Sequence, residues 1–215
     1  MKNKPQILLL AGNSGTGKTF LIEQIVQKYP EKFVRIPSLT TKKTTEKDQY
    51  LQISEAQFLK KLGLGEIIFP ADKEVFGAYY GVSKTLLEEA LNMDKIPIIT
   101  SNLVGLATFP EDLRGQTLIV AMISNDHEFV HKRLTLRSRP EDAEQIEKQV
   151  KISQEEWQKF YLEKTWRIPD LVDLLYKIRN NETIPKRILP KILMRFGLEL
   201  EIYKEIKSYQ KMRIY

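Results

Sequence analysis

The hydrophobic positions of this 215-residue chain follow two spacings that alternate along the sequence. Short, mostly apolar runs have the length and composition of buried strands. Between them, apolar residues recur every three or four positions, which is typical of amphipathic helices. This alternation predicts an α/β fold with a mostly parallel five-stranded sheet, flanked by helices and joined by right-handed crossovers. The five strands are expected at residues 5–11, 33–36, 96–100, 117–123 and 171–178.

Capping and helix-breaking residues mark where several helices begin and end. Pro30 cannot continue the first helix, and Ser54 with Gln57 forms a capping box before the second. Ser83 is a typical N-cap residue for the third. Helices are expected at residues 18–29, 55–62, 84–92, 103–109, 124–137, 142–164 and 182–194, and a final amphipathic helix at 196–215.

A region of shorter elements interrupts the alternation. Residues 37–48 are polar, β-branched and irregular. The short strands that follow suggest antiparallel pairing; they are expected at residues 49–53 and 66–69, with a hairpin at 71–81. This region predicts a small inserted lobe, residues 37–82, on a core formed by residues 1–36 and 83–195.

Composition adds three limits to this picture. An apolar fraction of 42% is enough for a buried core, and the absence of cysteine excludes disulfides and thiolate metal sites. No apolar run reaches the length of a membrane span, and the run of residues 7–11 is too short for the core of a signal peptide. These features predict a cytoplasmic protein with one globular domain and no membrane contact.

The net charge of +6 is concentrated at the end of the chain. Residues 186–215 contain eight basic and three acidic side chains, which gives this segment a charge of +5. A basic segment with interleaved tyrosines could contact nucleic acid or an acidic partner. We favour a solvated amphipathic helix that packs on the core, because charge runs most often form such faces.

The most informative polar stretch is a glycine-rich loop between the first strand and the first helix. It fits the phosphate-loop pattern G-x-x-x-x-G-K-[ST], in which backbone N–H groups and a helix N-terminus surround a phosphate. The lysine would reach the β- and γ-phosphates of a nucleoside triphosphate, and the hydroxyl of Thr19 would ligate Mg²⁺. The residues of the loop are Gly12, Asn13, Ser14, Gly15, Thr16, Gly17, Lys18 and Thr19.

Several classes of nucleotide-binding protein share this loop, and the rest of the chain narrows them. The Asn-Lys-x-Asp motif of regulatory GTPases and the Leu-Ser-Gly-Gly signature of ABC-type ATPases are both absent from the sequence. A small kinase needs an acceptor lobe, a mobile basic lid and groups that neutralise the transferred phosphoryl group. The lobe of residues 37–82 and the basic stretch around residues 133–139 are candidates for these parts.

Five further segments, in order, resemble the guanylate kinase family. Residues 38–42 resemble its Ser-x-Thr-Thr-Arg segment, residues 48–54 its Asp-Tyr-x-Phe-x-Ser strand, and residues 77–84 its Gly-Asn-Tyr-Tyr-Gly-Thr-Ser-Lys element. Arg133 and the residues after it resemble the start of the lid, and residues 174–181 the closing strand. The resemblance covers most of residues 6–183 and implies a phosphate-loop nucleoside monophosphate kinase fold, with a helical lid at about residues 135–150.

This resemblance also implies an activity and a set of site residues. The activity is transfer of the γ-phosphoryl group of ATP to a nucleoside monophosphate, GMP in the family, with Mg²⁺ as cofactor. The implied catalytic residues are Lys18, Arg137 and Arg139. Besides the phosphate loop, the donor nucleotide would be bound by Arg133 and by Asn180 or its neighbour Asn181. The implied acceptor-binding residues are Ser38, Lys42, Tyr50, Tyr80 and Asn102.

The chain departs from the family pattern mainly in the acceptor site. Lys42 replaces an arginine and lacks its bidentate fork. Phe69 aligns with the glutamate that reads guanine in the family, and Val82 with a small hydroxyl residue. Residues 100–102, Thr-Ser-Asn, align with Asp-x-Asp, and Gln149 with the second lid arginine. Apolar side chains cannot bond a guanine edge, so donor binding is retained while acceptor recognition is altered.

Two other functions stay open at this stage. One is a kinase of another phosphorylated small molecule, such as ribose 1,5-bisphosphate, since related kinases for that substrate also lack the guanine-reading glutamate. The other is a non-catalytic binding module, because guanylate kinase-like domains of scaffold proteins bind phosphopeptides. Those modules usually have a damaged phosphate loop, whereas this loop is intact and the acceptor side is altered, which favours an enzyme.

Overall fold

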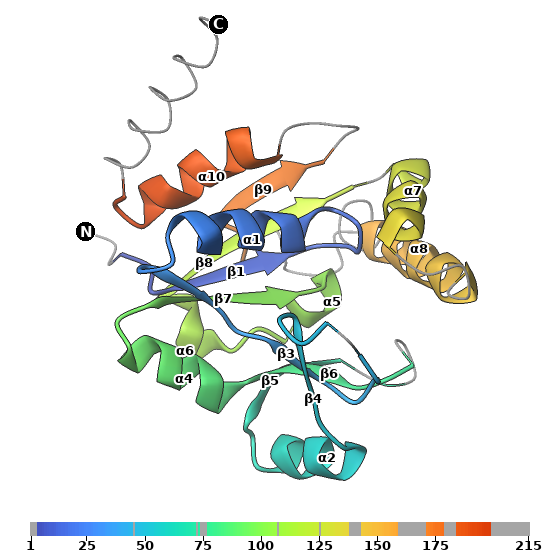
Figure 1. Ribbon diagram of the computed structural model, residues 1–215, viewed down its shortest axis with the longest axis horizontal. Helices are drawn as coiled ribbons and strands as arrows, with labels where there is room; N and C mark the ends of the chain where they lie inside the picture. Colours follow the sequence, from blue (N-terminus) through green and yellow to red (C-terminus); the bar gives the residue numbers. More distant parts are fainter. Residues whose placement is uncertain are drawn as a thin grey trace, which may run out of the picture.

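A five-stranded parallel sheet forms the centre of the molecule (Figure 1). Its strands run in the order β2-β7-β1-β8-β9 and all neighbouring pairs are parallel, as predicted. They are β1 (Ile7–Ala11), β2 (Phe33–Arg35), β7 (Ile96–Ser101), β8 (Thr117–Ile123) and β9 (Leu174–Lys177). The computed structural model describes residues 4–44, 46–71, 73, 77–106, 108–124, 126–137, 143–158, 171–178 and 184–198.

Helices cover both faces of this sheet, and every residue of its central strand, β1, is therefore buried. Leu8 and Leu10 of β1 belong to the core under α1 (Lys18–Lys28) and α10 (Ile184–Arg195). Ile7 and Leu9 point to the other face, as alternation along a strand requires. Burying each of these side chains contributes about 1.5–3 kcal/mol. The helices on that second face are α4 (Lys84–Asn92), α5 (Leu103–Leu106) and α6 (Glu111–Arg114).

On the second face one helical prediction needs correction, and one short helix was not predicted. A helix was expected over residues 103–109, but α5 has only four residues and ends at Leu106. The hydroxyl of Thr108 donates to the carbonyl of Gly105 at 3.0 Å, which forms a turn after the helix, and Pro110 follows. Pro110 is the N-cap of α6, a four-residue helix that the sequence pattern did not predict because it is too short to show a period.

A second, four-stranded sheet lies beside the first (Figure 1), in the order β4-β3-β6-β5. Its strands are β3 (Ser38–Thr40), β4 (Tyr50–Gln52), β5 (Ile67–Ala71) and β6 (Tyr80–Ser83). The helix α2 (Glu55–Gly63) packs Phe58 against Leu39 and Ile67. The capping box predicted for this helix is present, since Ser54 accepts from the Gln57 N–H and the Gln57 side chain accepts from the Ser54 N–H.

The strand β3 corrects two predictions about this region. Residues 37–48 were expected to be irregular, but Ser38–Thr40 pairs with β6 on one side and β4 on the other. A three-residue strand with one apolar side chain has no periodicity to detect, and it forms here through pairing with distant residues. The strands were also expected to be antiparallel, whereas β3 and β4 are parallel.

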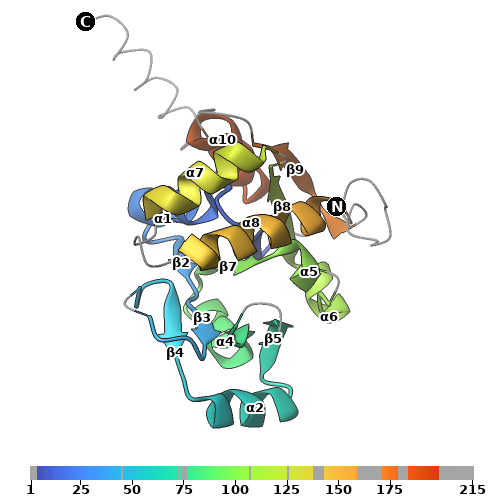
Figure 2. The same cartoon turned by 90° about the vertical axis from the view of Figure 1, so that its right-hand side faces the viewer.

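Two helices, α7 (His127–Arg137) and α8 (Ala143–Trp157), lie at the carboxyl ends of the parallel strands (Figures 1 and 2). They pack on each other through Val130 and Leu134 from α7 and Ile146 and Val150 from α8. The predicted lid residues 138–142 and the C-terminal helix beyond residue 198 lie outside the described residues. No helix in the described part of the chain is both long and apolar enough to cross a membrane.

Candidate functional site

The loop between β1 and α1 has the backbone shape that phosphate binding requires. At Gly12 φ is 141°, and a Cβ atom there would overlap the carbonyl oxygen of Met122, so only glycine fits. Gly17 also has a positive φ, 92°, and is the N-cap of α1. The first N–H groups of a helix have no intrahelical partner, and the helix dipole favours an anion at this end. The loop therefore offers a phosphate site where β1 ends.

The predicted lysine lies at this site. Its ammonium Nζ donates to the carbonyl oxygens of Gly12 and Asn13, at 2.6 and 2.8 Å. The Asn13 carbonyl also accepts from the Thr16 hydroxyl at 2.8 Å. Lys18 is thus held over the loop by neutral carbonyls, which a phosphate would outcompete because its full negative charge attracts the ammonium more strongly than a carbonyl dipole does.

The second sheet approaches the loop through one side chain that sequence reasoning did not single out. The hydroxyl of Thr19 donates to Oε1 of Gln49 at 3.4 Å, and Gln49 directly precedes β4. The Gln49 carbonyl accepts from the backbone N–H of Ser38 at 2.9 Å, which ties it to β3. This contact joins residues 30 positions apart, and no local pattern marks it. It places the predicted metal ligand, Thr19, between the two sheets.

Four of the predicted acceptor residues are brought together, three on the second sheet and one just after β3. Ser38 pairs with Tyr50 across β3 and β4, and Thr40 pairs with Tyr80 across β3 and β6. The rings of Tyr50 and Tyr80 meet edge to face, with centroids 6.0 Å apart. Lys42 follows β3, and its backbone N–H donates to the Thr40 hydroxyl at 3.1 Å. Two phenols, a serine and a lysine thus lie within one small region, a donor set suited to phosphate.

Burial raises the pKa of Tyr80 above its ordinary value near 10, the neighbouring Tyr50 adds to the increase, and a hydrogen bond with Thr40 opposes it. The unfolded chain therefore loses this phenolic proton first as the pH rises. Protonated Tyr80 therefore contributes to the free energy of unfolding. We expect this contribution of Tyr80 to be complete below about pH 10 and to be lost at higher pH. Urea unfolding between about pH 9 and 11 should show a smaller decrease for Tyr80→Phe than for the unmodified chain; equal decreases would contradict this assignment.

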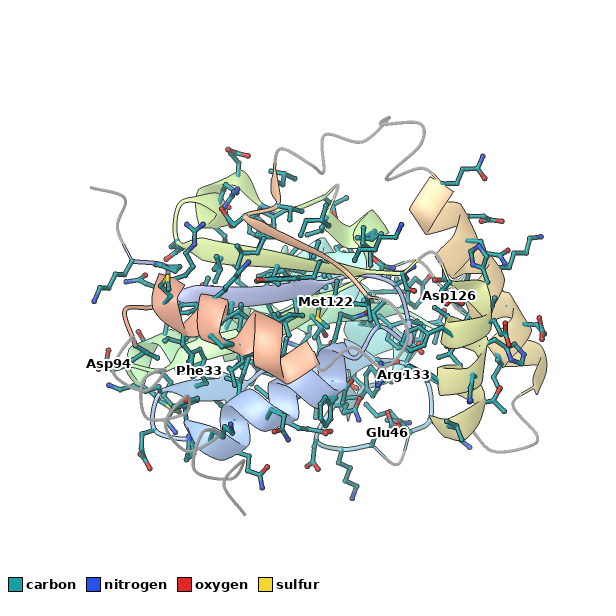
Figure 3. The ribbon with its side chains drawn as sticks, turned by 90° about the horizontal axis from the view of Figure 1, so that it is seen from above. Phe33, Glu46, Asp94, Met122, Asp126 and Arg133 are labelled. Carbon is teal, nitrogen blue, oxygen red and sulfur yellow. The ribbon has the colours of Figure 1, made fainter. Side chains whose placement is uncertain are left out.

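The arginines predicted for the lid are only partly described. Arg133 lies on α7, with its guanidinium 5.2 Å from the centre of the Phe129 ring, and Figure 3 shows it on the same helix that Asp126 caps. Arg137 is the last residue of α7. Arg139 and Asn180 lie outside the described residues, so their predicted roles stay predictions.

Asn102 has a local structural role in the fold. Its Oδ1 accepts from the backbone N–H of Gly105 at 2.7 Å and so caps the short helix α5. This oxygen is therefore already engaged, and the acceptor-binding role of Asn102 stays a prediction.

The backbone of β5 decides which of its side chains lies beside the predicted acceptor residue Tyr80. Phe69 is buried, has a φ of 54° and packs on Phe109 with ring centroids 5.5 Å apart. The register between β5 and β6 shifts between Ile68 and Ala71, and Ala71 becomes the partner of Tyr80. Cross-strand partners point to the same face of a sheet. The side chain beside Tyr80 is therefore that of Ala71, whereas Phe69 belongs to the core.

A parallel sheet with a phosphate loop after its central strand, a second sheet that reaches the loop and two helices over the strand ends define a phosphate-loop nucleoside monophosphate kinase fold. The family model described as guanylate kinase matches residues 3–164. Since this match covers well over half of the chain, the protein belongs to the guanylate kinase family.

Individual relatives agree with this assignment. A guanylate kinase of Anaplasma phagocytophilum is 30% identical over 155 residues, which cover 70% of this chain and 72% of that protein. A guanylate kinase of Thermotoga maritima is 20% identical over 212 residues, 94% of this chain and all of that protein. The crystal structure of guanylate kinase from Anaplasma phagocytophilum has the same fold, with a TM-score of 0.59 at 20% identity, covering 92% of this chain and 88% of that one.

Proposed function

We propose that this protein transfers the γ-phosphoryl group of ATP to the phosphate of a nucleoside monophosphate, with GMP as the first candidate acceptor. The observation that carries the proposal is the contact between Thr19 of the phosphate loop and Gln49 of the second sheet. It joins the donor loop to the sheet that carries Ser38, Tyr50 and Tyr80. This contact supports direct transfer between phosphates bound on its two sides, a reaction in which catalysis is mainly positioning and charge stabilisation.

Each residue then has a defined task. Lys18 leaves the loop carbonyls and binds the β- and γ-phosphates, and the first N–H groups of α1 bind the same anion. Arg133, Arg137 and Arg139 come from the lid and neutralise charge as the phosphoryl group moves. The acceptor oxygen forms the new P–O bond and the bond to ADP breaks, so the products are ADP and a nucleoside diphosphate.

The oxygen atoms around Thr19 fit a magnesium ion. Mg²⁺ prefers oxygen ligands and keeps several waters, with substrate phosphates completing its shell. The Thr19 hydroxyl and the side-chain amide oxygen of Gln49, Oε1, are such donors, and within the described residues no cluster of three or more His, Cys, Asp or Glu competes with them as a metal site. When bound, Mg²⁺ would neutralise charge on the β- and γ-phosphates.

The predicted acceptor site combines residues suited to a phosphate with an apolar side chain where a base would be read. The retained Tyr79-Tyr80-Gly81 element favours a nucleotide, and Ser38, Lys42, Tyr50 and Tyr80 are suited to its phosphate. Ala71 beside Tyr80 offers no side-chain hydrogen bond to a guanine edge. This apolar side chain is the observation that favours a second candidate acceptor, a sugar phosphate such as ribose 1,5-bisphosphate.

A coupled assay of ADP release tests the proposal against a panel of GMP, AMP, CMP, UMP and ribose 1,5-bisphosphate. We expect turnover that requires both ATP with Mg²⁺ and an acceptor, with GMP the best nucleotide. A preference for the sugar phosphate would replace the nucleotide by the second candidate. Absence of turnover with every acceptor, together with no heat of ATP–Mg²⁺ binding by calorimetry, would leave a non-catalytic binding module instead.

A further inference from the structure

The side chain of Asn13 points away from the phosphate-binding face of the loop and into the protein. It is fully buried. Its Nδ2 donates to the carbonyl oxygen of Ser124 at 2.9 Å and to that of Ser153 at 3.4 Å, and its Oδ1 accepts from the Ser124 N–H at 3.1 Å. One amide side chain thus makes three hydrogen bonds to backbone groups more than one hundred residues away in the sequence.

These partners belong to two different parts of the fold. Ser124 directly follows β8, the strand beside β1 in the central sheet. Ser153 is a buried residue of α8. Earlier in the same helix, Ile146 and Val150 pack on α7, which carries Arg133 and Arg137. Through Asn13 the phosphate loop is therefore connected both to the rigid sheet and to the helix pair that bears the lid arginines, which Figure 2 shows lying together.

The backbone of the same residue is connected to the phosphate site. The Asn13 carbonyl accepts from Lys18 Nζ at 2.8 Å and from the Thr16 hydroxyl at 2.8 Å. A bound phosphate would draw the ammonium of Lys18 away from this carbonyl, because a bond between two charged groups is the stronger one. The Asn13 carbonyl would then lose one of its two hydrogen bonds and keep the one from Thr16, while the Asn13 side chain still contacts α8 through Ser153.

We infer that Asn13 is a positioning residue that couples occupancy of the phosphate loop to the placement of α8 and, through it, of the lid arginines on α7. The inference takes ATP as the ligand of the loop and in this respect rests on the proposed function. A purely structural role for Asn13 would also cost stability when the side chain is removed, since two buried backbone groups of Ser124 would lose a partner. A test must therefore measure communication between the loop and α8 as well as stability.

The test compares the unmodified full-length chain with Asn13→Ala and Asn13→Ser, the second retaining a hydroxyl too short to span both carbonyls. The matched control is Thr117→Val. Thr117 is a buried residue at the opposite end of β8, and its hydroxyl donates to the carbonyl of Leu113 at 2.8 Å. This control removes one partly buried hydrogen bond from β8, the strand that Ser124 follows, without touching the loop or α8.

Hydrogen–deuterium exchange, with and without a non-hydrolysable ATP analogue, is the main measurement. In the unmodified chain and in Thr117→Val we expect the analogue to slow exchange both in residues 12–19 and in α8. In the Asn13 variants it should still slow exchange in the loop but no longer in α8. In the kinase assay kcat should fall by about tenfold or more, as a displaced catalytic group implies, with a smaller change in KM for ATP.

Each outcome decides the inference. Retained protection of α8 in a folded Asn13→Ala or Asn13→Ser variant would overturn it. If Asn13→Ala does not fold, Asn13→Ser gives the result. If the unmodified chain binds no ATP analogue, the proposed function fails, and exchange without nucleotide becomes the test: α8 must then exchange faster in the Asn13 variants than in Thr117→Val, and equal rates would overturn the connection through Asn13.

Discussion

Replacing Lys18 with alanine should lower kcat for phosphoryl transfer by about 100- to 1,000-fold, the usual effect of removing one charge-stabilising group from an active site. The ammonium is positioned over the loop by the carbonyls of Gly12 and Asn13 and is the cation nearest to the phosphates in the proposed mechanism. Because it would bind the transferred group in the transition state, the loss should appear in kcat as well as in kcat/KM. Steady-state assays of ADP release with the acceptor found in the panel measure both.

This variant should remain folded, which separates lost chemistry from lost structure. The two hydrogen bonds of Lys18 are only partly buried, and a bond from a charged group contributes about 1.5–3 kcal/mol, less than the total stability of a domain. Lys95→Ala is the matched control, since Lys95 also donates to a backbone carbonyl, that of Pro30 at 3.0 Å, but at an exposed position. Activity of Lys18→Ala within threefold of this control would contradict the role given to the phosphate loop.

The parts of the site that could be predicted are those whose functional residues follow one another in the sequence. The phosphate loop is one such part, because strand, glycines, lysine and helix follow one another within residues 7–28. Ser38, Tyr50 and Tyr80 could be selected only through a family resemblance. The structure brings them together through the pairing of β3 with β4 and β6, which joins residues up to about forty positions apart.

The contacts that could not be predicted depend on backbone geometry or on distant partners. The carbonyl of Ser153 lies 140 positions from Asn13, and nothing near either residue marks the bond between them. Likewise, an alignment made by counting residues along the sequence places Phe69 at the position of the glutamate that reads guanine in the family. The register shift between Ile68 and Ala71, with Phe69 at positive φ, sends the phenyl ring into the core and leaves Ala71 beside Tyr80. Such a shift depends on how β5 pairs with β6. Counting residues along β5 alone does not take this pairing into account.

The same register shift leads to a gain-of-function prediction. Ala71→Glu should lower KM for GMP by about tenfold to a hundredfold while leaving KM for AMP within a few-fold. A glutamate at this position would lie on the face of the sheet that carries Tyr80. Guanine presents neighbouring N–H donors that a carboxylate can accept in pairs, and hydrogen-bond readout of this kind is worth about 1–3 kcal/mol. The measurement is initial-rate kinetics with GMP and with AMP as competing acceptors.

Phe69→Glu is the control that distinguishes the two positions. Its side chain would replace a buried ring packed on Phe109, so it should lose at least about 3 kcal/mol of unfolding free energy and gain no preference for GMP. Urea unfolding and the same kinetics measure both quantities. If Phe69→Glu instead produced a stable enzyme with improved GMP selectivity, and Ala71→Glu did not, the acceptor would lie against the face of β5 that is here assigned to the core. The contrast therefore tests the orientation of β5 in the acceptor site as well as the identity of the acceptor base.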